Sequence, residues 1–251
     1  MADARARSGR RRTGVAYRRV VVKLSGESFA PVGTRGLDPR HLDEIAGKLA
    51  SAAGMGVELA VVVGGGNFIR GSNFAGSKLI RPVAAHQMGM IATVINGSAL
   101  VEALRAKSCP AVLTCSMPAG NFAEPYSPQK SQDDLSEGKI VVLTGGTGNS
   151  FVTTDTCAAI RAAELQAQAL LKATKVDAVY SDDPVKNPDA RKYAKLTYAE
   201  VIDKRLGVMD LAAVTICQEA NIPILVFNFQ ADDSIRKVLT GDLQGTTIRD
   251  Q

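Results

Sequence analysis

The sequence predicts an α/β protein: a three-layer sandwich in which helices cover both faces of a mainly parallel sheet. Two observations predict this fold. Short runs of β-branched and other apolar residues alternate along the chain with amphipathic segments of helical length. Glycine-rich turns directly follow several of these runs. Ligands of such sheets bind beyond the carboxyl ends of the strands, so these turns are the place to look for a site.

The order of the elements follows from hydrophobic periodicity. We expect strands near 20–24, 57–63, 111–115, 139–144, 168–173 and 222–227, and helices near 39–53, 83–107, 154–166, 198–204, 209–220 and 233–240. The first helix has the clearest signals. Asp38 can cap it, Pro39 suits its first turn, and Gly54 follows its last apolar residue.

Composition predicts one globular domain over residues 18–251. The chain has 251 residues, of which 45% are hydrophobic and 22% charged, and its apolar runs are too short to span a bilayer. We therefore expect no membrane role. No internal repeat or Pro/Ser-rich linker divides this domain.

Residues 1–17 are predicted to be a disordered, arginine-rich extension. Seven arginines and a single acid fall within the first 19 residues, and this segment alone exceeds the +5 net charge of the whole chain. The remaining chain is close to neutral. A solvated tail is the favoured interpretation, and nucleic-acid binding by the tail is the alternative.

The cysteine and histidine content limits which metal and catalytic sites the chain could form. The four cysteines form no C-x-x-C pair and lie within or beside apolar stretches: Cys109, Cys115, Cys157 and Cys217. Buried, reduced thiols are expected, which indicates the cytoplasm. With only His41 and His86, the chain has little material for a histidine-based zinc site or a Ser-His-Asp triad.

The predicted strand ends carry groups that bind phosphate. Residues 20–24 run into Lys23, Ser25 and Gly26, residues 61–63 into GGGNFIR with Arg70, and residues 141–144 into GGTGNSFVTTD. Lys172 lies in a further strand. Each turn alone could be a tight turn with no ligand, but several at one edge predict a cradle for a polyphosphate.

Two common nucleotide motifs are absent. The dinucleotide pattern G-x-G-x-x-G ends on Ile69 if begun at Gly64 and on Phe151 if begun at Gly146. The P-loop pattern fails because serine and asparagine stand where lysine and Ser/Thr are required. Neither of those two folds is indicated.

The segment 146–155 opens the predicted helix 154–166. Thr153 and Thr154 offer hydroxyl and N–H groups at a helix N-terminus, which suits a phosphate, although for this feature alone a plain threonine cap is the favoured interpretation. Asp155 is unusual beside an anion site. We assign it to organising the cationic groups.

Together these motifs resemble the bacterial uridine monophosphate kinases of the amino acid kinase family. KLSGE, GGGN-x-x-RG, MGM-x-AT, GTGN, TTD, KATKVD, LTY-x-EV, VMDL and VFN occur in this order between about residues 19 and 248. KATKVD with the following VY-x-x-DP is the most specific part, because it separates this branch from kinases that act on amino acids.

The resemblance implies phosphoryl transfer from ATP to UMP, giving ADP and UDP, with Mg²⁺ on the phosphates. It implies an acceptor-binding part that is mostly N-terminal and an ATP-binding part that is mostly C-terminal. The implied ATP-binding residues are Lys23, Leu24, Ser25, Gly26, Gly66, Arg70, Thr174, Tyr180 and Asp183. The implied UMP-binding residues are Gly65, His86, Thr147, Gly148, Asn149, Ser150, Phe151, Val152, Thr153 and Thr154.

Because phosphoryl transfer depends mainly on positioning and charge neutralisation, we expect Lys23 and Lys172 to stabilise the transferring group, with Asp155 holding them. Asp210 is either a further residue of this kind or a helix cap. A homohexamer built from dimers, activation by GTP and inhibition by UTP are also implied. The loop 31–36, which would respond to GTP, keeps only part of the family pattern.

Three positions depart from the family pattern. His86 stands where an acid usually contacts the ribose of UMP, and Ser150 and Val152 replace a proline and a phenylalanine of the acceptor segment. Affinity or selectivity for the acceptor is expected to differ. The alternatives are a related kinase with a carboxylate or carbamate acceptor, and a non-catalytic ATP-binding storage or regulatory protein on the same fold, such as the molybdenum storage proteins.

Overall fold

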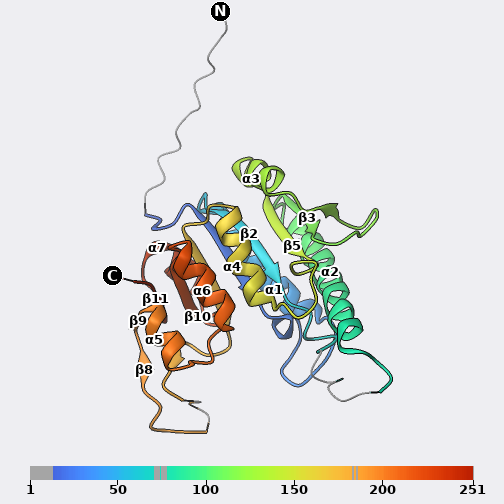
Figure 1. Ribbon diagram of the computed structural model, residues 1–251. Coiled ribbons are helices and arrows are strands. Elements are labelled where there is room, and N and C mark those ends of the chain that lie inside the picture. Colours follow the sequence, from blue (N-terminus) through green and yellow to red (C-terminus); the bar gives the residue numbers. More distant parts are fainter. Residues whose placement is uncertain (1–13, 71–73, 75–77, 183, 185, 251) are drawn as a thin grey trace, which may run out of the picture.

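A nine-stranded sheet forms the centre of the computed structural model, which describes residues 14–70, 74, 78–182, 184 and 186–250 (Figure 1). The strand order is β4-β3-β5-β2-β1-β6-β10-β11-β9, and every neighbouring pair is parallel except β10 with β11. The strands are β1 (Arg19–Leu24), β2 (Glu58–Val63), β3 (Ala111–Cys115), β4 (Glu124–Pro125), β5 (Ile140–Thr144), β6 (Ala169–Thr174), β9 (Lys195–Leu196), β10 (Ile224–Asn228) and β11 (Thr246–Ile248). A separate antiparallel pair is formed by β7 (Val179–Tyr180) and β8 (Lys192–Tyr193).

Helices cover both faces of the sheet. One face carries α1 (Pro39–Gly54), α2 (Pro82–Ala106) and α7 (Ser234–Thr240), and the short 3₁₀ helix η1 (Gly26–Phe29) follows β1. The other face carries α3 (Pro128–Ser136), α4 (Thr154–Glu164), α5 (Tyr198–Asp203) and α6 (Leu211–Glu219), with α4 and α6 side by side (Figure 1). Among the helices of the described residues, none is long and apolar enough to cross a membrane.

Alternation along the central strand creates the two cores. Val20, Val22 and Leu24 of β1 belong to the core under α1, α2 and α7, whereas Val21 belongs to the core under α4 and α6. Successive side chains of a strand point to opposite faces, so a strand buried on both sides must be apolar at nearly every position. This is why the valine-rich runs predicted the sheet.

The predicted three-layer α/β fold is confirmed, and all six predicted strands and six predicted helices are present with shifts of one or two residues at their ends. The sequence analysis did not predict α3, β4, β7, β8, β9 and β11. Four of these strands have two residues and α3 is mostly polar, so hydrophobic periodicity gives little signal. Because β11 is antiparallel to β10, one edge of the sheet is mixed.

The folded domain begins before the predicted boundary at residue 18. Val15 and Tyr17 pack against the core, and the N–H of Ala16 donates to the carbonyl of Leu239 at 2.7 Å. The arginines dominate the composition of this segment, so composition alone did not indicate that these two apolar residues pack against the core. The predicted extension is therefore too long at its carboxyl end, and its residues 1–13 lie outside the described part of the chain.

Two truncations test this boundary. Removing residues 1–13 is expected to leave the melting temperature unchanged, whereas removing residues 1–17 also removes Val15, Tyr17 and the Ala16 hydrogen bond. We expect the longer deletion to cost about 2 kcal/mol, or about 4–8 °C in melting temperature for a domain of this size. Equal melting temperatures for the two truncated chains, measured by calorimetry, would contradict the packing role.

Candidate active site

Sheet register places two lysines side by side. In the parallel pairing of β1 with β6, Lys23 lies directly opposite Lys172. Each lysine follows by two positions a residue of the core beneath α4, so both side chains point toward that helix. Both residues are only 8% exposed. Two ammonium groups thus share one buried location near the carboxyl ends of the central strands.

A single carboxylate lies between the two lysines. Asp155 is the second residue of α4, whose N-cap is Thr153. Its Oδ1 lies 2.8 Å from the Nζ of Lys23, and its Oδ2 lies 2.5 Å from the Nζ of Lys172. The positive end of the helix dipole also favours a carboxylate in the first turn. Both carboxylate oxygens are therefore used by the lysines, which agrees with the predicted organising role.

Burial and charge shift two of these groups. Burial raises the pKa of Asp155, but the charges of Lys23 and Lys172 and the hydrogen bonds from both outweigh it, so the pKa of this carboxyl is lowered. The pKa of Lys172 is lowered to about 8, first because burial disfavours the ammonium form and then because the charge of Lys23 is close. Asp155 opposes that lowering without cancelling it.

The hydrogen bonds of Asp210 hold the N-termini of two helices, α6 and α4. It is the N-cap of α6, where its Oδ1 accepts from the N–H of Ala213 at 2.9 Å. The same Oδ1 accepts from the hydroxyl of Thr156 at 2.6 Å, and Oδ2 accepts from the hydroxyl of Thr153. Of the two roles considered from sequence, the helix cap is the one present, and the cap also fixes the N-terminus of α4.

The glycines after β1 and β2 serve two different purposes. A Cβ at Gly26 would lie 2.5 Å from the nitrogen of Gly66, and one at Gly64 would lie 2.7 Å from the nitrogen of Gly26, so the two turns pack against each other. A Cβ at Gly65 would lie 2.6 Å from the carbonyl oxygen of Gly89 in α2. At Gly66 the nearest atom is the Nε of Arg70 at 3.9 Å, so of these four glycines only Gly66 could carry a Cβ without a clash.

The open side of Gly66 borders a basic cavity of about 300 Å³. Arg70 and Lys175 line it together with the loop 31–35, and both side chains face Glu27 of η1, Lys175 at 3.7 Å. Arginine and lysine around a main-chain turn provide the donors that phosphate oxygens accept from.

Ser25 and Leu24 are less available than the resemblance implies. The hydroxyl of Ser25 caps η1 by accepting from the N–H of Glu27 at 3.4 Å. The side chain of Leu24 is fully buried in the core, and its carbonyl accepts from the N–H of Gly64 at 2.9 Å. Leu24 supports the turn from below and offers no side-chain contact to a ligand.

A second cavity lies between β2, α2 and the segment before α4. Its volume is about 130 Å³, and Gly65, His86, Val152 and Thr154 are among the residues that line it. The ring of His86 packs against that of Phe151, with centroids 4.7 Å apart. Phe151 has a φ of 65°, which is uncommon for a bulky side chain and costs backbone strain of a kind that functional sites can carry. The tertiary structure thus brings together Gly65, His86 and the carboxyl-terminal part of segment 147–154.

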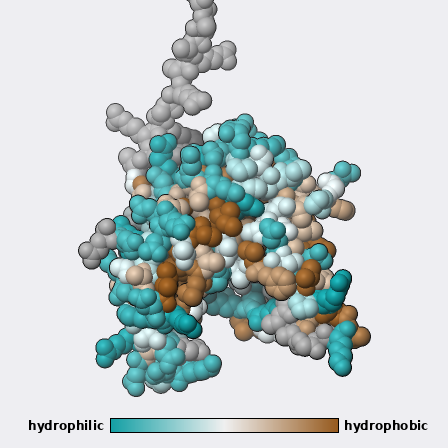
Figure 2. Space-filling model, viewed as in Figure 1, coloured by the Kyte–Doolittle hydropathy of each residue, from teal (hydrophilic) through white to brown (hydrophobic). Residues whose placement is uncertain are grey.

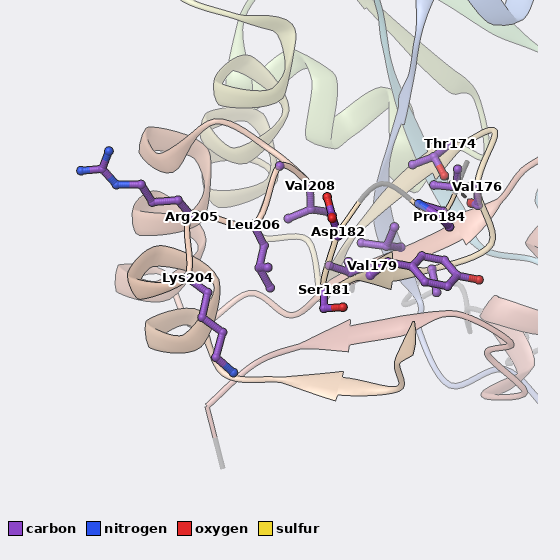
Figure 3. A pocket seen from close by; sticks show the side chains of 14 residues that line it. Thr174, Val176, Val179, Ser181, Asp182, Pro184, Lys204, Arg205, Leu206 and Val208 are labelled. Atoms are coloured by element: carbon purple, nitrogen blue, oxygen red, sulfur yellow. Dashed lines mark hydrogen bonds between the residues drawn. The ribbon is translucent and has the colours of Figure 1, made fainter. Parts of the chain in front are cut away.

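A third cavity lies near the carboxyl end of β6, with a volume of about 510 Å³. Thr174, Val176 and Val179 line one side of it, and Leu206 and Val208 line the other (Figure 3). Apolar walls with a few polar groups at this volume suit a nucleobase with its sugar. Tyr180 also lines it and donates its hydroxyl to Asp177 at 2.8 Å, whereas Asp183 lies outside the described residues.

Thr93 is a site residue that the sequence analysis did not single out. Its hydroxyl oxygen accepts from the N–H of Gly145 at 2.8 Å and donates to the carbonyl of Met90 at 2.6 Å. It therefore connects α2 to the first residue of the glycine-rich segment after β5. The available signal was the motif MGM-x-AT, of which Thr93 is the last residue.

The surface reflects this arrangement. In the lower part of the visible face, a hollow separates the part that carries α5 from the part that carries the N-terminal end of α2 (Figures 1 and 2). β1 and β2 direct their carboxyl ends toward this hollow (Figure 1). The two lysines and the glycine turns described above belong to these strand ends, which is where ligands of parallel sheets bind.

Comparison with known proteins agrees with this geometry. Residues 18–228 match the amino acid kinase family. The chain belongs to the amino acid kinase family. The uridylate kinases of Shewanella loihica and Shewanella baltica are 44% and 43% identical to it over 234 residues, which is 93% of this chain and 94% and 95% of theirs.

The chain is also similar in three dimensions to solved structures with the amino acid kinase fold. The UMP kinase of Bacillus anthracis has a TM-score of 0.90 at 35% identity and covers 94% of this chain and 97% of its own. The UMP kinase of Ureaplasma parvum has a TM-score of 0.87 at 32% identity and covers 93% and 99%. The order and layering of the elements are therefore shared with these kinases.

The lowered pKa of Lys172 makes stability depend on pH in alkaline solution. Between pH 8 and its ordinary value of 10.5, Lys172 is deprotonated in the folded state but protonated in the unfolded state. The free energy of unfolding should therefore gain a contribution that rises with pH, by at most about 1.4 kcal/mol per pH unit. Lys172→Met removes this contribution. Urea denaturation at pH 7.5, 8.5 and 9.5 gives the free energy of unfolding of both proteins. The value for wild type minus the value for the variant should increase with pH. A difference that does not change with pH would contradict the lowered pKa of Lys172.

Proposed function

We propose that the chain is a UMP kinase that transfers the γ-phosphate of ATP to UMP, giving ADP and UDP. The observation that carries the proposal is the buried group Lys23–Asp155–Lys172, whose helix α4 begins beside the 130 Å³ cavity and whose strand β6 ends at the 510 Å³ cavity. The relatives named uridylate kinase and UMP kinase support the choice of acceptor.

The reaction needs positioning and neutralisation of charge more than a dedicated nucleophile. A phosphate oxygen of UMP attacks the γ-phosphorus, and the bond to the bridging oxygen of ADP breaks. Lys23 and Lys172 supply positive charge to the transferring group, and Asp155 holds their ammonium groups in place. Asp210 and Thr153 keep the start of α4, and so Asp155, in position.

ATP is assigned to the C-terminal side of the molecule. The adenosine end occupies the cavity with Thr174 and Tyr180, and Asp183 is carried over from the family pattern alone. The phosphates run toward Lys23, Gly26, Gly66 and Arg70 with the Ser25 turn, since open space and cations meet there. Leu24 contributes by supporting this turn.

UMP is assigned to the cavity of Gly65 and His86 and to the segment 147–154. Thr153 and Thr154 present N–H groups at the start of α4, where the helix dipole favours the acceptor phosphate. The turn Thr147–Asn149 and the exposed Phe151 and Val152 lie along the rest of the nucleotide.

Mg²⁺ enters as the ion carried by the nucleotide phosphates, where it neutralises their charge. Asp155, the carboxylate beside the two lysines, has both oxygens on ammonium groups and is therefore built to hold lysines. When the nucleotide is bound, its phosphate oxygens would hold the ion.

The proposal also covers the oligomeric state, the regulation and the cellular location of the enzyme. Ile91 and Ile95 of α2 are exposed apolar residues one helical turn apart, which supports a subunit interface within a homohexamer. GTP activation and UTP inhibition are carried over from the family. The four cysteines are buried as thiols, which suits a cytoplasmic enzyme of pyrimidine nucleotide biosynthesis.

A coupled assay of ADP release with UMP, CMP and dUMP tests the function. We expect turnover with UMP that exceeds turnover with CMP. A storage or regulatory protein would bind ATP and release no ADP with any acceptor, and a kinase for a carboxylate or carbamate would release ADP only with that acceptor. Either outcome would overturn the proposal.

Lys23→Met is expected to lower kcat by about two to three orders of magnitude, or about 3–4 kcal/mol of transition-state stabilisation. The reason is the loss of one of two ammonium groups at the transferring phosphate. The matched control is Lys130→Met, which removes a lysine of α3 that pairs with Glu124 and Asp134. Near-normal turnover of Lys23→Met in the coupled assay would refute the assigned role.

His86→Asp is expected to sharpen the preference for UMP over dUMP. A carboxylate can accept hydrogen bonds from both ribose hydroxyls, whereas a neutral imidazole has one donor and one acceptor. The variant also loses the ring contact with Phe151, so Phe151→Leu serves as the control for that contact. The ratio of kcat/KM for UMP and dUMP is the measurement, and an unchanged ratio would place His86 away from the ribose.

A further inference from the structure

A buried polar cluster lies on the far side of the segment 145–149 from α2. Its centre is Arg161 of α4, which is only 6% exposed. One guanidinium nitrogen lies 2.5 Å from the Oε2 of Glu164, and the carbon of the guanidinium lies 3.8 Å from the centroid of the Tyr126 ring. The hydroxyl of Tyr126 donates to the same Glu164 oxygen at 2.7 Å. A buried charge requires partners of this kind, so the position of the guanidinium is fixed.

From this fixed guanidinium, a chain of hydrogen bonds leads to the acceptor segment. The Nη2 of Arg161 donates to the Oγ of Ser116 at 2.9 Å, and the Oγ of Ser116 donates to the carbonyl oxygen of Gly146 at 2.8 Å. Because arginine can only donate, the serine oxygen must accept from it, and the serine proton is directed to Gly146. The charge on Arg161 also strengthens the second hydrogen bond by polarising the hydroxyl.

The segment that receives this hydrogen bond forms a turn, in which the N–H of Gly148 donates to the carbonyl of Gly145 at 2.9 Å, and it is rich in glycine. Gly145, Gly146 and Gly148 all have positive φ, between 56° and 79°, and none carries a side chain. Thr93 holds Gly145 from the side of α2, and Ser116 holds Gly146 from the side of β3. Two side-chain hydrogen bonds therefore hold adjacent residues of the segment, one from α2 and one from the residue that follows β3.

We propose that Arg161 and Ser116 are positioning residues that set the affinity for UMP without touching either nucleotide. Arg161 belongs to the helix whose first turn carries Asp155, so one rigid element holds both the lysine pair and the acceptor segment in register. The inference rests on the proposed function in one respect, namely that segment 147–154 holds UMP.

Ser116→Ala is the test. It removes the hydroxyl between Arg161 and Gly146, and we expect the KM for UMP to rise about fivefold, because a hydrogen bond of this kind is worth about 1 kcal/mol. The KM for ATP should change little. Ser116→Thr keeps the hydroxyl, and the neighbouring cavity of about 520 Å³ has room for the added methyl group, so this variant should restore the KM for UMP.

Ser131→Ala is the matched control, since Ser131 is a buried serine of α3 whose hydroxyl has no hydrogen-bond partner among the residues that the structure describes. It should leave both KM values unchanged. Thr154→Val tests the assigned UMP position directly. If Thr154→Val leaves the KM for UMP unchanged, the placement of UMP is wrong. If Thr154→Val raises it and Ser116→Ala does not, or if Ser116→Ala raises both KM values equally, the positioning role is overturned.

Discussion

The contact of Asp155 with Lys23 and Lys172 is the interaction on which the rest of the site depends. Two ammonium groups at adjacent positions of β1 and β6 repel each other, and both are almost fully buried. A carboxylate from the first turn of α4 offsets this repulsion and still leaves one net positive charge. That remaining charge suits the transferring phosphoryl group of the proposed reaction. The start of α4 must therefore be placed accurately, and its caps explain the surrounding polar residues.

Helix α4 links the parts of the site into one body. Its first turn holds Asp155 and is fixed by Asp210 through two threonines, while Arg161, two turns later, reaches Ser116 and the glycine-rich segment after β5. A glycine-rich segment can approach a ligand closely, but its glycines have no side chains that could hold it in place, so contacts from neighbouring elements add to its own turn hydrogen bond. Thr93 and Ser116 provide this support from opposite sides.

Much of the architecture follows from the sequence alone because its strands are buried on both faces. Continuous apolar runs predicted all six long strands, and the Asp38 and Pro39 signals predicted α1, whose cap has the expected hydrogen bonds. The two-residue strands, the polar helix α3 and the antiparallel β11 gave no such signal, since their placement depends on pairing with distant segments. The packing of Val15 and Tyr17 was concealed by the arginines around them.

For the candidate site, too, some features followed from the sequence and others depended on the tertiary structure. The sequence by itself determined the chemical groups: two lysines, an aspartate that organises them and glycine turns at strand ends. Only the tertiary structure decided which glycines pack against other backbone and which leave open space, because that depends on the distance between turns remote in sequence. It also decided that Asp210 caps a helix, that His86 meets Phe151, and that Arg161 reaches Gly146 through Ser116. Those contacts join residues from different elements, and local sequence patterns carry no information on such distances.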